Sequence, residues 1–114
     1  MIVLSGRVVA HTTERRELVQ ALLDWVSAAR RDPELEAAYL YEDLEIPAVF
    51  NLVTEWKTAP ALEAHLHTDC FGVLQGALKV LARPYQLAIT RPDSELDGAI
   101  GAINRVRTEG KAEA

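Results

Sequence analysis

The fold is decided by residues 48–84, which read AVFNLVTEWKTAPALEAHLHTDCFGVLQGALKVLARP. Residues 48–57 are rich in β-branched and aromatic residues, which indicates a strand. Side chains alternate between the two faces of a strand, so one face of this segment carries Phe50, Leu52, Thr54 and Trp56. From Pro60 to Pro84, apolar residues recur at steps of three and four, which predicts one long amphipathic helix.

The rest of the chain alternates between strand and helix patterns. The predicted elements are strands at 2–10, 35–45 and 85–91 and a helix at 14–31. Thr12 or Thr13 is the expected N-cap of that helix, whose apolar stripe includes Trp25. The order βαββαβ predicts a ferredoxin-like α+β sandwich, with a four-stranded antiparallel sheet and helices on one face. This domain spans residues 1–91, and residues 92–114 are expected to be a tail that is partly disordered or packed on a partner subunit.

Composition and charge exclude several classes of protein. The chain has 114 residues, of which 49% are hydrophobic and 25% charged, as is ordinary for one globular domain. Its formal net charge of -5 argues against a nucleic-acid partner, since phosphate binding requires a basic surface. No apolar run approaches the roughly 20 residues that cross a bilayer, so no membrane association is expected. The N-terminus lacks the pattern of a signal peptide, and the single cysteine, Cys70, suits a reducing cytoplasm.

The second face of the predicted sheet points to a partner. Helices on one side leave the other side bare, yet that side carries apolar residues at Val3, Val9, Val49 and Val53. An exposed apolar sheet face of this size usually marks an interface. We therefore expect a two-fold symmetric homodimer in which two sheets pack face to face.

Two motifs carry a resemblance to a known family. The predicted strand ends in Thr54-Glu55-Trp56, and the helix opens with ALEAHL at residues 61–66, followed by Phe71. With the βαββαβ order, this pattern resembles the antibiotic biosynthesis monooxygenase domain family. The resemblance implies a dimeric α/β barrel with a pocket in each protomer, between the sheet and the helices. It also implies oxidation of aromatic phenols or quinols with dioxygen, without a metal or a bound organic cofactor.

The resemblance also separates two branches of that family. The haem-degrading branch has an Asn, a Trp and a haem-ligating His at positions that read Gly6, His65 and Gln75 here, which argues against haem degradation. The phenol-oxidising branch uses an Asn, a Trp and an Arg. Trp56 matches that Trp, whereas the Asn position falls on Leu52 and no residue is matched to the Arg.

Trp56 and His65 are the candidate catalytic residues. Trp56 can form an aromatic wall whose indole N–H is free to bond a substrate oxygen, or it can simply pack in the core. His65 titrates near neutral pH and can deprotonate a phenol or quinol, which makes the anion that reacts with dioxygen. The alternative is a structural histidine bonded to a backbone carbonyl. The candidate substrate-binding residues are Phe50, Leu52, Phe71, Leu74 and Arg7.

No metal and no cofactor are expected. His65 and His67 are two residues apart on a helix and point in different directions, so they cannot share a metal well. His65 and Asp69 have a better spacing, but two ligands without a third make a weak site. Cys70 lies on the apolar stripe and is expected to pack as a small core residue rather than to act as a nucleophile.

The sequence therefore predicts a cytoplasmic, homodimeric monooxygenase that acts on a small aromatic phenol or quinol. One alternative is a non-catalytic dimeric module that binds a small hydrophobic ligand or is purely structural. Another is an isomerase or lyase that uses His65 as a base without oxygen. A pocket large enough for a ring system would favour an enzyme, whereas a site filled by Phe50, Leu52 and Trp56 themselves would favour the structural alternative.

Overall fold

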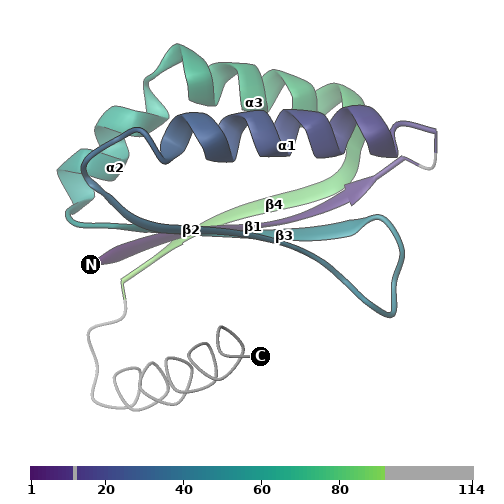
Figure 1. Ribbon diagram of the computed structural model, residues 1–114, viewed down its shortest axis with the longest axis horizontal. Coiled ribbons are helices and arrows are strands. Elements are labelled where there is room, and N and C mark those ends of the chain that lie inside the picture. Colours follow the sequence, from purple (N-terminus) through teal and green to yellow (C-terminus); the bar gives the residue numbers. More distant parts are fainter. Residues whose placement is uncertain (12, 92–114) are drawn as a thin grey trace.

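The computed structural model describes residues 1–11 and 13–91 and has the predicted α+β architecture (Figure 1). The elements in this part of the chain are β1 (Ile2–Ala10), α1 (Arg15–Ala29), β2 (Leu35–Glu42), β3 (Val49–Trp56), α2 (Ala59–Leu66), α3 (Asp69–Leu81) and β4 (Ala82–Thr90). The four strands form one antiparallel sheet in the order β2-β3-β1-β4, so the ferredoxin-like fold is confirmed. Thr12, one of the two predicted N-caps, and the predicted tail at 92–114 lie outside the described residues.

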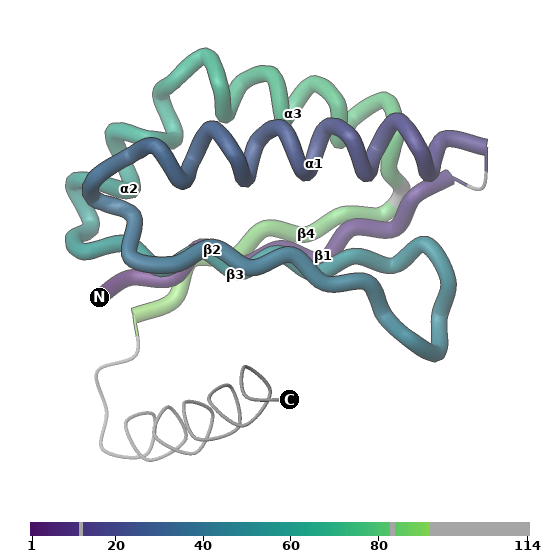
Figure 2. Tube along the Cα trace, viewed as in Figure 1, coloured from purple at the N-terminus to yellow at the C-terminus, as the bar shows by residue number. Residues whose placement is uncertain are grey.

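The helices cover one face of the sheet, and the core lies between the two layers (Figures 1 and 2). Burial along β1 alternates residue by residue, and the predicted inward face of β3 is fully buried. This alternation follows from the geometry of a strand, in which every second side chain points to the same side. The layer of buried side chains beneath the helices includes Leu4, Val8, Leu18, Leu22, Leu52, Trp56, Leu62 and Leu78.

The predicted long helix is wrong in one respect, because it is divided into α2 and α3 at His67 and Thr68. Thr68 causes the break by capping the second helix. Its hydroxyl donates to the carbonyl of His65 at 2.6 Å and accepts from the N–H of Phe71 at 3.3 Å. The apolar periodicity continues across this point, so the hydrophobic pattern alone does not reveal it. The break follows directly after the turn that contains His65.

The last strand begins at Ala82, earlier than the predicted start at Tyr85. Pro84 therefore lies inside a strand, and α3 has already ended at Leu81. Among the described strands β4 pairs only with β1, and its register shifts between Val8 and Ala10. A proline removes a ladder donor, so it is tolerated at an edge strand or at an irregularity of this kind.

The start of α1 also differs from the prediction. The N-cap is Glu14, which makes no side-chain capping bond, so the predicted cap by Thr13 is wrong. Arg15 instead links the start of the helix to the β2–β3 hairpin through an ion pair with Glu42. Its Nη2 and Nε donate to the two carboxylate oxygens of Glu42 at 2.6 and 3.2 Å, and its guanidinium lies 5.5 Å from the ring centroid of Phe50. A bidentate ion pair of this kind fixes geometry as well as charge.

Gly76 provides a test of the α3 assignment. It lies in the interior of α3 on an exposed surface, and a Cβ built there would meet no atom within 4 Å. Glycine in a helix interior costs about 0.5–1 kcal/mol relative to alanine. We therefore expect Gly76→Ala to raise the free energy of unfolding by about 0.5–1 kcal/mol, as measured by urea denaturation.

Gly6 is the matched control for this substitution. A Cβ at this position would lie 2.7 Å from Leu87 Cδ2 and 3.2 Å from Leu52 Cγ, so those side chains must shift to admit it. Gly6→Ala is expected to lower the free energy of unfolding. A stabilising Gly6→Ala, or a destabilising Gly76→Ala, would contradict the packing described.

The face of the sheet opposite the helices is more exposed. Val3, Val9 and Val53 are only half-buried there, whereas Val49, which was expected on the exposed face, is buried. Tyr39 and Tyr41 are 37% and 51% exposed. The two tyrosine rings stack with their centroids 6.1 Å apart. This surface carries large apolar and aromatic groups that nothing within the described residues covers. None of the described helices is long and apolar enough to span a membrane.

Candidate functional site

His65 points into the core from the short helix α2. Thr58 starts this helix, since its side chain accepts a hydrogen bond from the N–H of Ala61 at 3.2 Å. Leu62 and His65 lie three residues apart and therefore share one face of the helix. They are the two buried residues of α2, and His65 is only 4% exposed.

Three aromatic rings from three different elements surround His65. The ring centroids of Trp25 in α1, Trp56 in β3 and Phe71 in α3 lie 5.6, 4.7 and 6.0 Å from that of the imidazole. Trp25 and Phe71 present their edges, whereas the ring of Trp56 is tilted. Each such contact is worth about 0.5–1.5 kcal/mol beyond the area it buries. The fold thus brings together the predicted residues Trp56, His65 and Phe71.

A buried hydrogen bond defines the protonation state of His65. The indole Nε1–H of Trp25 donates to His65 Nε2 at 3.2 Å. An indole N–H is a donor only, so Nε2 must carry the lone pair and the proton must be on Nδ1. Burial lowers the pKa of His65 by disfavouring the charged form, and Asp32 opposes this effect through its negative charge. The imidazole is therefore neutral at physiological pH, with Nε2 as an acceptor.

The lowered pKa of His65 predicts a loss of stability in mild acid. The unfolded histidine takes up a proton near its ordinary pKa of 6.5, whereas the folded one resists protonation. The free energy of unfolding should therefore fall as the pH drops below about 6.5, by at most about 1.4 kcal/mol per pH unit. Denaturation experiments between about pH 7.5 and pH 5 measure this slope. The exposed carboxylates Glu42 and Asp43 take up protons only at lower pH, because their pKa values are lowered, so they do not contribute in this window.

His65→Gln is the control for this pH dependence. A glutamine oxygen can accept the bond from Trp25 but does not titrate. The variant is expected to show a flatter stability profile in the same range. An equally steep profile would show that the slope does not come from His65.

Trp56 does not have the free N–H that the sequence suggested. Its indole Nε1–H donates to Thr54 Oγ1 at 2.9 Å, and the Thr54 hydroxyl donates in turn to the carbonyl of Leu4 at 3.1 Å. Trp56 is 0% exposed and Thr54 is also 0% exposed, so this chain of bonds is closed to solvent. Trp56 therefore serves as a fixed wall behind His65, and its polar atom is already satisfied within the core.

The fold places two other predicted binding residues away from His65. Leu52 and Phe50 share the inward face of β3 with Trp56 but lie four and six residues before it. At the usual rise of a strand these separations are about 13 and 20 Å. Leu74 is placed differently, because it lines a cavity together with Trp25.

Arg7 is separated from His65 by the sheet itself. It pairs across β1 with Asn51 of β3 and Gln86 of β4, and its side chain is exposed on the face that the helices leave open. A depression of about 200 Å³ on that face is lined in part by these three residues. Arg7 therefore belongs to the open face and not to the histidine site.

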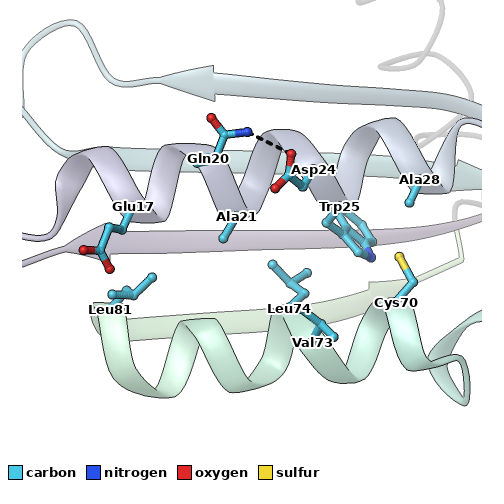
Figure 3. Close-up of a pocket in the computed structure, with 10 residues that line it drawn as sticks. All are labelled: Glu17, Gln20, Ala21, Asp24, Trp25, Ala28, Cys70, Val73, Leu74 and Leu81. Carbon is cyan, nitrogen blue, oxygen red and sulfur yellow. Dashed lines mark hydrogen bonds between the residues drawn. The ribbon is translucent and has the colours of Figure 1, made fainter.

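A groove of about 530 Å³ opens between α1 and α3 (Figure 3). Both helices contribute side chains that point toward each other across it, as Figure 3 shows for Trp25 and Leu74. The lining residues are Glu17, Gln20, Ala21, Asp24, Trp25, Ala28, Cys70, Val73, Leu74 and Leu81. The family resemblance implied a pocket between the sheet and the helices, whereas this cavity lies between two helices. Its size is within the range of small-molecule sites.

Trp25 is the site residue that sequence reasoning did not identify. The sequence places it only on the apolar stripe of the first helix. In the structure it lines the groove and also donates to His65, so it connects the two. A buried tryptophan usually needs a hydrogen-bond acceptor for its indole N–H. This requirement is the one feature of the sequence that could have suggested an acceptor such as His65.

The remaining candidates take no part in a metal cluster. The Nδ1 of His67 lies 2.8 Å from the carbonyl of Glu63, and the side chain is exposed. Cys70 is half-buried at the groove, and burial raises the pKa of its thiol. Within residues 1–11 and 13–91, no group of three or more His, Cys, Asp and Glu side chains is arranged to hold a metal ion.

These features define a ferredoxin-like α+β protein with a neutral histidine buried next to an interhelical groove. Residues 1–76 match the family model described as antibiotic biosynthesis monooxygenase. The match covers more than half of the chain. The chain belongs to the antibiotic biosynthesis monooxygenase family.

Solved structures share the fold of this chain. An antibiotic biosynthesis monooxygenase matches with a TM-score of 0.74 and 19% identity, over 82% of this chain and 100% of that chain. A protein from Mycobacterium tuberculosis matches with a TM-score of 0.75 and 18% identity, over 82% of this chain and 96% of that one. A conserved protein from Methanosarcina mazei matches with a TM-score of 0.73 and 18% identity, over 79% and 90% of the two chains. Comparison with curated proteins gives no match.

Proposed function

We propose that the protein is a monooxygenase that oxidises a small aromatic phenol or quinol with dioxygen and uses no cofactor. The observation that carries this proposal is the neutral His65, whose acceptor Nε2 is linked through Trp25 to an apolar groove of substrate size. Membership of the family supports a monooxygenase role in general. The rings around His65 support an aromatic substrate in particular.

In this reaction His65 acts as the base. Its Nε2 takes the proton of a substrate hydroxyl, and the resulting anion is rich enough in electrons to reduce dioxygen. One oxygen atom enters the ring and the other leaves as water, so that a phenol and dioxygen give a quinone and water. The substrate supplies all the electrons. Trp56 and Phe71 hold the imidazole, and Leu74 provides apolar contact in the groove.

Oxygen consumption by metal-free protein tests the proposed function. A panel of quinols and polycyclic phenols is added to the purified protein, and uptake is compared with autoxidation of each compound alone. The proposal predicts uptake above that background for at least one compound, with one water formed per dioxygen consumed. Hydrogen peroxide as the only oxygen product would contradict a monooxygenase, because no oxygen atom would have entered the substrate.

A non-catalytic binding module is the second candidate. The observation that favours it is the resting structure itself, in which Trp25 occupies Nε2 of His65 and Trp56 and Leu52 are 0% and 1% exposed in a filled core. Such a module would bind a small hydrophobic molecule in the groove without turning it over. Saturable binding of a phenol with no oxygen uptake from that same compound would select this function.

We propose further that two copies pair through the open face of the sheet, in the cytoplasm. The half-buried Val3, Val9 and Val53 and the stacked Tyr39 and Tyr41 give that face an apolar and aromatic character. The depression of about 200 Å³ on this face offers a place for a side chain of the partner. The single cysteine fits a reducing compartment.

The dimer is tested by mass in solution. The chain has a mass of 12.6 kDa, and sedimentation equilibrium is expected to give about twice that value. Val53→Glu places a charge in the proposed interface and should weaken dimerisation by at least about tenfold. Leu23→Glu, on an exposed position of α1, is the control and should leave the dimer intact. Val53→Glu protein that stays dimeric would show that the interface lies elsewhere.

A further inference from the structure

The helix layer has an apolar surface that the other described residues leave uncovered. Val73 and Val80 lie seven residues apart on the same side of α3 and are 73% and 72% exposed. Val73 also lines the groove between α1 and α3, where Leu74 and Leu81 form more of the apolar wall (Figure 3). An apolar groove with an exposed apolar rim is typical of a surface that binds an amphipathic helix.

The two ends of this groove differ in charge. Glu17 lies at one end, beside Leu81, and Asp24 lies along the same wall (Figure 3). At the other end, burial raises the pKa of the Cys70 thiol, and the positive charge of Arg31 opposes this rise. The groove therefore favours a helix that brings acidic residues to the Cys70 end and a basic residue to the Glu17 end.

The tail of this chain contains a segment with the matching sequence pattern. Residues 92–114 lie outside the described part of the chain, and residues 94–107 read SELDGAIGAINRVR. Leu96, Ile100 and Ile103 follow at steps of four and three, which is the spacing of one helix face. The acidic residues of this segment come first and the basic residues last, which is the order of charge that the groove favours.

Local signals in the tail predict a helix that needs a surface to pack on. Ser94 and Asp97 have the spacing of a capping box, which predicts that a helix begins at residue 95. Gly98 and Gly101 each cost about 1 kcal/mol in a helix interior. A short helix with two glycines is marginal in water, so packing of its apolar face must stabilise it.

The chain leaves the sheet at the end that lies beneath the Cys70 end of the groove. The last strand, β4, finishes at Thr90, which pairs with Val3 near the start of β1. The C-terminal end of α1 lies over this same end of the sheet, because α1 leads into β2 there. Residues 91–95 span up to about 17 Å when extended, which exceeds the roughly 10 Å between packed layers.

The length of the predicted helix also matches the groove. Between Ala28 and Glu17 the wall formed by α1 is about 16 Å long, and a helix over residues 95–107 is about 20 Å long. A helix that starts at the Cys70 end therefore brings its last residue, Arg107, to Glu17.

We propose that residues 95–107 form an amphipathic helix that docks in the groove between α1 and α3 of the same chain. Leu96, Ile100 and Ile103 cover the apolar lining, and Arg107 pairs with Glu17. A second copy docked by this same surface would instead bring its own carboxylates against Glu17. The docked helix covers Trp25 from the groove side and so closes the entrance to the proposed oxygenase site, and only this last consequence rests on the proposed function.

Disulfide trapping tests the docked position in the full chain. Cys70 is the one cysteine and lines the groove, so a second cysteine reports which tail residues reach it. Position 99 lies three residues after Leu96, on the docked face, whereas position 101 points about 200° away from position 99. Under a redox buffer, Ala99→Cys should form an intrachain disulfide with Cys70 at least about tenfold faster than Gly101→Cys, the matched control.

Three outcomes of this trapping experiment would overturn the proposal. Equal rates for Ala99→Cys and Gly101→Cys would show a tail without a fixed face toward the groove. A disulfide that links two chains would place the helix on a second copy. The absence of any disulfide in Ala99→Cys would place the tail elsewhere.

Alkylation of Cys70 measures docking without an added cysteine. Ile100→Glu/Ile103→Glu puts charges on the docked face, and alkylation should become at least about threefold faster as the groove opens. Arg105→Gln is the control, because position 105 lies nine residues after Leu96 and therefore on the opposite side of the helix. An unchanged rate in the isoleucine double variant would overturn the docking.

Charge reversal tests the direction of the helix. Arg107→Glu opposes Glu17 and should speed alkylation of Cys70, whereas Glu17→Arg/Arg107→Glu restores the pair and should restore the protection. A reversed pair that leaves Cys70 unprotected would overturn the proposed direction. None of these measurements involves substrate or turnover. A protein with a protected Cys70 but no oxygen uptake would refute the oxygenase and leave the docked tail intact.

Discussion

Trp56→Ala is expected to lower the free energy of unfolding by about 3–5 kcal/mol. The side chain is 0% exposed and lies between the sheet and His65, so its removal leaves a cavity that the layers on both sides cannot easily fill. It also removes the donor that bonds to Thr54 Oγ1 inside the core. Urea denaturation of the purified variant measures the loss.

Leu23→Ala is the control for this large effect. Leu23 is 47% exposed on α1 and is absent from the groove lining, so its truncation should change the free energy of unfolding by no more than about 0.5 kcal/mol. Trp56→Phe keeps an aromatic ring, so its loss of unfolding free energy should lie between those of Leu23→Ala and Trp56→Ala. A loss below about 1 kcal/mol for Trp56→Ala would contradict the central place of Trp56 in the core.

The second large effect concerns turnover. His65→Gln is expected to reduce substrate-dependent oxygen uptake by about 100- to 10,000-fold, the usual contribution of a general base. Glutamine can accept the hydrogen bond from Trp25, so the fold and the groove should persist. It cannot hold a proton at neutral pH, and the substrate therefore stays in its unreactive neutral form.

His67→Gln is the matched control for turnover. His67 follows α2 and has an exposed side chain, so this change should leave oxygen uptake within about threefold of the parent protein. His65→Gln protein with unimpaired uptake would show that another group removes the proton or that none is needed. Circular dichroism of both variants separates a chemical effect from unfolding.

The sequence predicts the sheet well because its signal is local. The alternation in β1 and β3 determines which side chains face the helices, and the antiparallel order follows from the number and sequence of the elements. The division of the second helix was missed because apolar residues keep their spacing across Thr68, where a single hydroxyl ends one helix and starts the next. Periodicity reports which face is buried and does not report where a helix is interrupted.

The site is less predictable because its contacts are long-range. Trp25 and His65 are 40 positions apart, so no local pattern links them, and their hydrogen bond depends on how α1 and α2 dock on the sheet. Residue type alone suggests that Arg7 and Phe50 lie near His65. The fold instead places Arg7 on the opposite face of the sheet and Phe50 far along β3. Residue type suggests which side chains could belong to a site, but the tertiary packing determines which of them lie close together.

The most direct test of this account is the tautomer of His65, observed by heteronuclear NMR of isotope-labelled protein at neutral pH. The two ring nitrogens have distinct shifts and couplings in each tautomer, so the protonated atom can be identified. We expect a neutral ring with the proton on Nδ1, and a coupling or contact from the Trp25 indole N–H to Nε2. A charged imidazolium, or a proton on Nε2, would contradict the hydrogen bond on which the proposed base depends.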